Sequence, residues 1–282
     1  MLVKKIMLIT MLSLVVANAL SIVVHANEQQ EENFIQIVKA FMPLNSSLIN
    51  PNMPVSTKSI QFYDFNNDGQ KEIIFTFEIK AKDQPAPSHF GVIVLKKDQT
   101  GWHKVWETIT EGVSLDVSGL IDITGDGIKE YLFGVTIGAA IGNELEVFQW
   151  GNHSLKEIAE IPYHKMDVVK EKQKVAIAIW QLYIGDSYLV DVLKWNGDKL
   201  VDDEASYLKY YPKIEKFYHD KISQMDAWFY WYCLADAQIK ARKLDEAYRS
   251  IQKGIEIAKK SAVQEAVQYF DDLIKKLMNK KK

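Results

Sequence analysis

The chain has 282 residues, of which 48% are hydrophobic, and a formal net charge of −3. This mild acidity argues against nucleic acid as the main partner, because phosphate backbones select strongly basic surfaces. The single cysteine, Cys233, excludes an internal disulfide and any zinc site built from cysteines.

The first 26 residues are typical of a secretory signal peptide. Lys4 and Lys5 precede an apolar run over 6–24, and Ala26 completes a Val-His-Ala sequence suited to signal peptidase. The alternative is an uncleaved anchor, because the run is almost long enough to cross a bilayer. Cleavage would leave 32 basic and 37 acidic residues, a net charge of −5. We therefore expect a secreted or envelope-associated protein with no membrane span after signal cleavage.

A short helix is the first element expected after the signal. Apolar residues recur at helical spacing at Phe34, Ile35, Val38 and Phe41. Pro43 ends this pattern, and a loop rich in proline, asparagine and serine follows. Residues 27–58 are thus predicted to form an N-terminal helix and loop.

Residues 59–202 have the pattern of a β region, in which short β-branched and aromatic runs alternate with turns. The expected strands include Glu72–Lys80, Phe90–Lys96, Glu130–Thr136, Leu145–Trp150, Val175–Leu182 and Tyr188–Trp195. Strand–turn–strand units that begin at Phe90, Leu145 and Leu189 lie about 45 to 55 residues apart. Such a period is typical of propeller blades or similar stacked β units.

Residues 203–282 have a helical composition, dominated by lysine, glutamate, alanine, glutamine and leucine. Pro212 is expected to break an early segment, and long helices are predicted over about 226–241, 244–259 and 261–279. The fold class is therefore mainly β with a helical C-terminal region (α+β), as a partial or small propeller-like stack plus antiparallel helices.

One acidic motif occurs twice in the β region, at Asp64–Glu72 and again 58 residues later at Asp122–Glu130. Each copy places side-chain oxygens at positions 1, 3 and 5, a glycine at 6, a carbonyl at 7 and a carboxylate at 9. Ca²⁺ prefers six to eight oxygen ligands, which a tight loop can supply from alternate residues. The alternative is a pair of ordinary Asp-Gly turns without metal.

These loops are not EF-hands, because Phe75 and Phe133 stand where the bidentate glutamate belongs. Each leads into an apolar strand and resembles the FG-GAP/VCBS repeats of integrin-like β-propellers, in which such loops bind Ca²⁺. The resemblance covers about 59–202 and implies structural rather than catalytic metal. It implies one site formed by Asp64, Asn66, Asp68, Gln70 (backbone) and Glu72. It implies a second, weaker site formed by Asp122, Thr124, Asp126, Ile128 (backbone) and Glu130.

The sequence departs from the FG-GAP/VCBS pattern in two ways. A third copy, expected near Asp167, lacks the Asp-Gly pair, so metal binding is not expected there. Three units are also too few for a closed ring of four or more blades. The β region is therefore predicted to be a partial propeller, an open stack or half of an oligomer.

Large and small residues alternate at helical spacing from Trp231 through Ala241 to Ile255, and on this pattern the segment over about 228–261 resembles one tetratricopeptide repeat. Small residues, among them Ala235, Ala247 and Gly254, let two antiparallel helices approach each other. In that family such repeats bind peptides or partner proteins. The aromatic run over 228–232 is either a platform for a partner or glycan, or a helix buried on two sides.

No catalytic motif accompanies these features, and Cys233 is expected to be an inert buried thiol. The leading hypothesis is an exported non-catalytic binding or scaffold protein with structural Ca²⁺ loops. Its partner would be an unknown protein or an envelope glycan. The alternatives are a cell-envelope hydrolase acting on glycan or peptide, and a partner-docking module that uses the helical tail.

Overall fold

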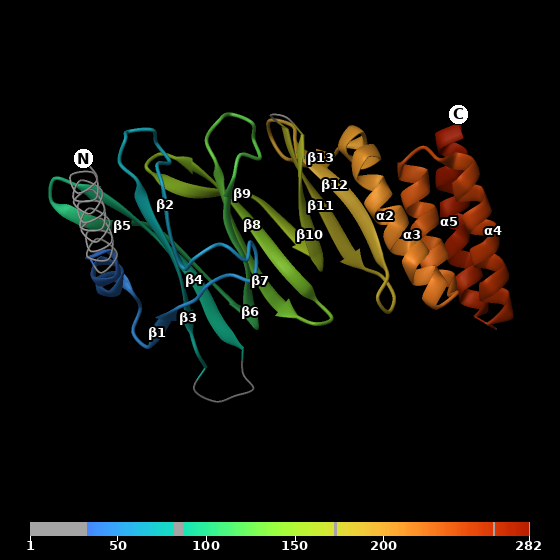
Figure 1. The fold of residues 1–282 in the computed structure, drawn as a ribbon, viewed down its shortest axis with the longest axis horizontal. Helices are drawn as coiled ribbons and strands as arrows, with labels where there is room; N and C mark the ends of the chain where they lie inside the picture. The colour runs from blue at the N-terminus through green and yellow to red at the C-terminus, as the bar shows by residue number, and fades with distance from the viewer. Residues whose placement is uncertain (1–32, 82–86, 172–173, 262, 282) are drawn as a thin grey trace, which may run out of the picture.

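The computed structural model describes residues 33–81, 87–171, 174–261 and 263–281. The predicted signal peptide lies outside the described residues. The chain forms three antiparallel sheets followed by a helical C-terminal region, as the sequence predicted (Figure 1). None of the described helices is long and apolar enough to cross a membrane.

The sheets are built from consecutive strands. Sheet 1 has the order β1-β3-β4-β5, with β2 also paired to β3, and contains β1 (Ser46–Leu48), β2 (Ile60–Tyr63), β3 (Glu72–Ile79), β4 (Ser88–Asp98) and β5 (Gly101–Gly112). Sheet 2 contains β6 (Ser114–Ile121), β7 (Glu130–Gly138), β8 (Gly142–Gly151) and β9 (Ser154–Tyr163). Sheet 3 contains β10 (Lys165–Glu171), β11 (Lys174–Leu182), β12 (Tyr188–Trp195) and β13 (Leu200–Asp202).

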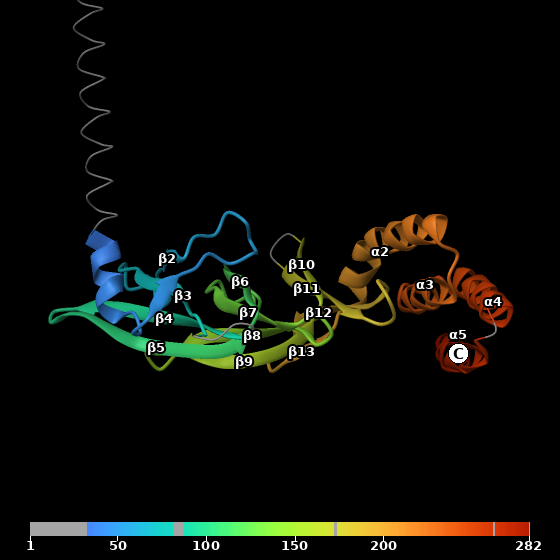
Figure 2. The same cartoon turned by 90° about the horizontal axis from the view of Figure 1, so that it is seen from below.

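The three sheets stack face to face in one row and do not close into a ring. Ile74 and Val92 of sheet 1 pack against Phe133 of sheet 2, and Leu132 on the other face of sheet 2 packs with Ile177 of sheet 3. Figure 2 shows β2, β6 and β10 along one side of the row and β5, β9 and β13 along the other. Within this chain the sheets therefore form an open stack.

Helices cover both ends of the stack. A helix over 33–41 lies on the outer face of sheet 1, where Val38 is fully buried with Phe75 and Ile93. The outer face of sheet 3 is covered by α2 (Glu204–Gln224) and α3 (Trp228–Lys240), and α4 (Leu244–Lys260) and α5 (Gln264–Lys281) follow. The apolar faces at the two ends of the stack are thus removed from water.

The aromatic run over 228–232 belongs to α3 and is buried on two sides. Tyr230 and Leu234 pack with sheet 3 and α2, while Trp228 and Tyr232 contact the core formed with α4 and α5. Cys233 is 2% exposed, and burial raises the pKa of its thiol to about 12. The thiol is therefore protonated at neutral pH, in line with an inert side chain.

Two sequence expectations were wrong. Pro212 does not break the chain but lies inside the continuous helix α2. The carbonyl of Leu208 loses its helical donor there, but both residues lie on the exposed face, where water can replace the bond. The predicted loop after Pro43 contains β1, and Met53 within it forms a parallel bridge to β6, because such short pairings carry no periodic signal.

Gly254 tests the packing of the helical region. An added Cβ would lie 2.3 Å from Phe270 Cζ and 3.1 Å from Trp231 Cβ. We expect Gly254→Ala to lower the free energy of unfolding by about 1–3 kcal/mol, since overpacking outweighs the gain in helix propensity. Urea unfolding followed by circular dichroism measures this, with Gly151→Ala as the control because no atom lies within 4 Å of its added Cβ. Equal stability of the Gly254 variant and the parent would contradict the packing described.

Candidate functional site

The two acidic loops occupy equivalent positions in sheets 1 and 2. The first joins β2 to β3 and the second joins β6 to β7, and both lie along the same long edge of the row, at the top of Figure 1. They contact each other, because the Lys129 backbone N donates to the Tyr63 hydroxyl (2.9 Å) and its Nζ lies 5.6 Å from the Tyr63 ring centroid. The sequence repeat therefore corresponds to a spatial pair.

The first loop is closed by its own carboxylates. Asp64 Oδ2 accepts from Gly69 N (2.9 Å), and Asp68 Oδ1 accepts from Gln70 N (2.8 Å). Gly69 has a φ of +84°, in the left-handed region that favours glycine. These bonds define a tight turn with Asp64 and Asp68 at its base.

The second loop repeats the same bonds. Asp122 Oδ2 accepts from Gly127 N (3.1 Å), and Asp126 Oδ1 accepts from Ile128 N (2.8 Å). Gly127 has a φ of +90°. The two loops thus share one fold and not only one sequence pattern.

The last glutamate of each loop is buried and holds the chain that enters the loop. Glu72 is 1% exposed and accepts from Phe65 N (3.0 Å), while Glu130 is fully buried and accepts from Ile123 N (2.7 Å) and Thr124 N (3.1 Å). Burial raises the pKa of Glu130, although these hydrogen bonds oppose the shift. Each glutamate thereby fixes the residue after the first aspartate, whose side chain enters the core between sheets.

A lysine ammonium lies at the first loop. Lys96 Nζ, on β4, is 2.7 Å from Asp68 Oδ2 and 2.9 Å from Glu72 Oε1. The hydrogen bond from Lys96 is the main reason that the pKa of Asp68 is lowered to about 2. The first loop therefore carries an internal cation between two of its predicted metal ligands.

The second loop has a neutral amide at the corresponding place. In sheet 1, Ile73 pairs with Leu95, which places Lys96 opposite Glu72. In sheet 2, Tyr131 pairs with Phe148, which places Gln149 opposite Glu130. Gln149 Nε2 donates to Asp126 Oδ2 (3.3 Å). The two loops thus differ in one charge supplied from the neighbouring strand.

The other predicted ligands are less closely gathered. Asn66 Nδ2 donates to Asp68 Oδ2 (2.9 Å), and Thr124 Oγ1 donates to Glu130 Oε1 (2.9 Å). In the described part of the chain, no three histidine, cysteine, aspartate or glutamate side chains converge as a ready metal site. Asp167, near which a third copy was expected, lies in strand β10 and pairs with Lys213 (2.7 Å).

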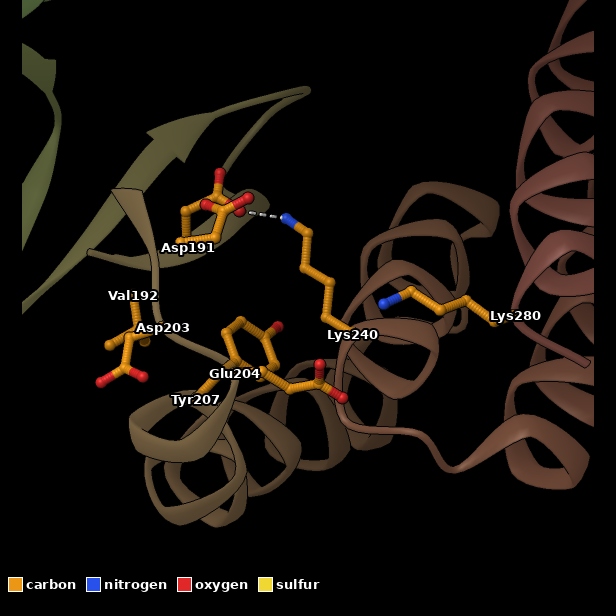
Figure 3. Close-up of a pocket in the computed structure, with 8 residues that line it drawn as sticks. Asp191, Val192, Asp203, Glu204, Tyr207, Lys240 and Lys280 are labelled. Atoms are coloured by element: carbon orange, nitrogen blue, oxygen red, sulfur yellow. Dashed lines mark hydrogen bonds and ion pairs between the residues drawn. The ribbon is translucent and has the colours of Figure 1, made fainter. Parts of the chain in front are cut away.

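A polar cavity of about 190 Å³ lies where sheet 3 meets the helices (Figure 3). Its lining residues are Asp191, Val192, Asp202, Asp203, Glu204, Tyr207, Lys240 and Lys280. Lys240 Nζ, from α3, contacts Asp191 (2.5 Å), Asp236 (3.0 Å) and the carbonyl of Val190 (2.9 Å). Burial alone would lower the pKa of Lys240, but attraction to the two carboxylates prevails and raises it. These paired charges hold α3 against β12.

Four glutamates gather on β8 and β9 of sheet 2. Glu146 pairs with Glu160 in strand register, and one carboxylate oxygen of Glu146 is buried with no hydrogen-bond partner among the described residues. Burial, together with the charges of Glu157, Glu144 and Glu160, raises the pKa of Glu146 to about 7. No local sequence pattern indicates this cluster, because it forms only when the two strands pair.

The sequence matches no protein-family model, and no curated protein shows significant similarity to it.

The glutamate cluster predicts a pH dependence of stability. Because the pKa of Glu146 in the folded protein exceeds the ordinary value of 4.5, protonation favours the folded state. The free energy of unfolding should fall by about 1–2 kcal/mol as pH rises from about 5 to about 8. Urea unfolding at both pH values measures the change.

Glu146→Gln should remove most of this dependence, whereas the exposed Glu111→Gln on β5 should leave it intact. An unchanged pH profile in the Glu146 variant would show that the cluster does not cause it.

Proposed function

We propose that the chain is an exported, non-catalytic binding or scaffold protein, built as a propeller-like repeat stack and stabilised by Ca²⁺ at its second acidic loop. The observation that carries the metal proposal is a pair of loops that share three backbone-to-carboxylate hydrogen bonds, of which only the first contains an ammonium. Similarity to FG-GAP/VCBS repeats supports the same conclusion.

The residues of the second loop fit a hard cation in charge and donor type. Asp122, Asp126, Glu130, the Thr124 hydroxyl and the Ile128 carbonyl are all oxygen donors. Carboxylate oxygens that already accept one N–H retain a second lone pair for a metal. When bound, the ion would supply positive charge beside a buried glutamate, and binding would require the loop's carboxylates to turn further inward.

Export is consistent with such a site. A loop that supplies most ligands from one short segment is expected to bind Ca²⁺ in the range of extracellular modules, about 10⁻⁴–10⁻³ M. This range is useful only where free Ca²⁺ is abundant, and the predicted signal peptide would take the protein there. The ion would add stability to a chain whose only cysteine forbids an internal disulfide.

The partner site we propose is the outer edge of sheet 3. β10 is the outermost strand of its sheet, and no described strand pairs with its free edge. The corresponding strand of sheet 2, β6, is covered: Met53 N donates to Asp116 O (2.7 Å), and Ser118 N donates to Met53 O (3.2 Å). An open strand edge offers main-chain donors and acceptors to an extended peptide. The edge of β6 offers the same groups to the segment around Met53.

The side chains of β10 define the chemistry of the peptide. Met166 and Val168 face sheet 2 and line a groove of about 330 Å³ together with Val55. Lys165 is opposite Trp180 on the other face, and its ammonium lies 4.1 Å from the Tyr188 ring centroid, with no carboxylate partner among the described residues. A strand with apolar side chains on one face and acidic ones on the other would complement both.

The metal proposal predicts one Ca²⁺ equivalent per chain by calorimetric titration. Ca²⁺ should raise the melting temperature, with a stabilisation of about 2.7 kcal/mol at a hundredfold excess over the dissociation constant. Glu130→Gln should abolish the heat, and Asp68→Asn should leave it unchanged. No heat and no gain in melting temperature with the wild-type protein would refute the proposal.

The edge proposal predicts saturable binding of a fluorescein-labelled peptide of alternating valine and glutamate, measured by anisotropy. Val168→Glu should weaken binding about tenfold, since it places a charge in the apolar groove. Val113→Glu is the control, because Val113 is 64% exposed outside the groove. In an added strand only every second peptide amide donates to β10, so N-methylation of that set should abolish binding and N-methylation of the other set should not. Equal effects of the two sets would contradict strand addition.

A further inference from the structure

The position of Lys96 determines how the first loop obtains its positive charge. Its side chain is 19% exposed, and its ammonium contacts Asp68 and the almost fully buried Glu72. The lysine is therefore charged and held, rather than a solvated surface group.

This ammonium and a divalent cation compete for the same oxygens. Asp68 Oδ2 and Glu72 Oε1 belong to two of the residues that the sequence assigned to the first Ca²⁺ site. A Ca²⁺ ion bound by both would lie within a few ångströms of the ammonium, where like charges repel strongly at low dielectric. Displacing Lys96 instead would break its contacts with Asp68 (2.7 Å) and Glu72 (2.9 Å), and the free-energy cost of breaking them would weaken Ca²⁺ binding.

The strand register gives an internal comparison. Gln149 holds the place of Lys96 beside the second loop. The two copies share the bonds to the first aspartate from Gly69 or Gly127, to the Asp68 or Asp126 carboxylate from the residue after that glycine, and to the buried glutamate from Phe65 or Ile123. The two loops therefore present the same acids with and without an internal cation.

We infer that Lys96 is a built-in counter-ion that replaces metal in the first loop, so that this loop closes without Ca²⁺ while the second depends on it. The first-loop residues Asp64, Asn66, Asp68, Gln70 and Glu72 then form an ion-pair latch instead of a metal site. The part of this inference that concerns the second loop, its dependence on Ca²⁺, rests on the proposed function. The part that concerns the first loop, its closure without metal, rests only on the contacts of Lys96 with Asp68 and Glu72.

Two reciprocal substitutions in the full chain test the inference. Lys96→Gln gives the first loop the neutral neighbour of the second, and Gln149→Lys gives the second loop the ammonium neighbour of the first. The Lys96 variant should have a lower melting temperature than the wild type in a chelator, should regain stability with Ca²⁺ and should bind one more Ca²⁺ equivalent. The Gln149 variant should lose Ca²⁺ heat and become less sensitive to the chelator.

Lys97→Gln is the matched control, because Lys97 is the exposed neighbour on the same strand. It should match the wild type in stoichiometry and melting temperature. Calorimetric titration with Ca²⁺ gives the stoichiometry, and melting in chelator and in Ca²⁺ gives the stability.

The outcomes separate this inference from the proposed function. A wild-type protein that binds two equivalents, one of them lost in Asp68→Asn, would overturn the role of Lys96. So would a Lys96→Gln variant with unchanged stability in chelator and no added Ca²⁺ binding. A wild type that binds no Ca²⁺ beside a Lys96→Gln variant that binds one would support the counter-ion while refuting the second-loop site.

Discussion

Every sheet in this protein has two apolar faces, and the need to cover both determines the architecture. In β3, Ile73 and Phe75 face the helix over 33–41 while Ile74 faces sheet 2, and all three are fully buried. Each such side chain stabilises the fold by about 1.5–3 kcal/mol only when it is removed from water. A single sheet cannot satisfy this condition, so the sheets stack and helices close the row at both ends.

The acidic loops follow from the same constraint. Phe65 and Ile123 must enter the cores between sheets directly after a half-buried aspartate, which leaves their backbone N–H groups buried. Glu72 and Glu130 satisfy those donors, but each brings a buried negative charge. A buried carboxylate is stable only with compensating positive charge or proton uptake. Lys96 supplies positive charge to Glu72, whereas Glu130 accepts three hydrogen bonds from Ile123 and Thr124 and has no ammonium contact among the described residues.

Local patterns in the sequence predicted the elements well, and contacts between distant residues were beyond them. The strands over 130–136 and 188–195 and the helix over 244–259 were predicted close to their observed bounds, because periodicity and turn residues are local signals. The loop repeat was found for the same reason. The contact of Lys96 with Glu72 could not be predicted, because the two residues are 24 positions apart and meet only through strand register. The pairing of Met53 with β6 is equally invisible in the sequence.

The helices at the two ends of the stack also bear on how such a protein can change in length. A closed ring fixes the number of its units, because the angles between neighbours must sum to a full turn. A row that begins with the helix over 33–41 and ends with α2 and α3 has no such condition. A unit could be gained or lost between the ends if its two faces matched its neighbours. The terminal helices would then act as fixed boundaries, and the number of sheets between them could vary during evolution.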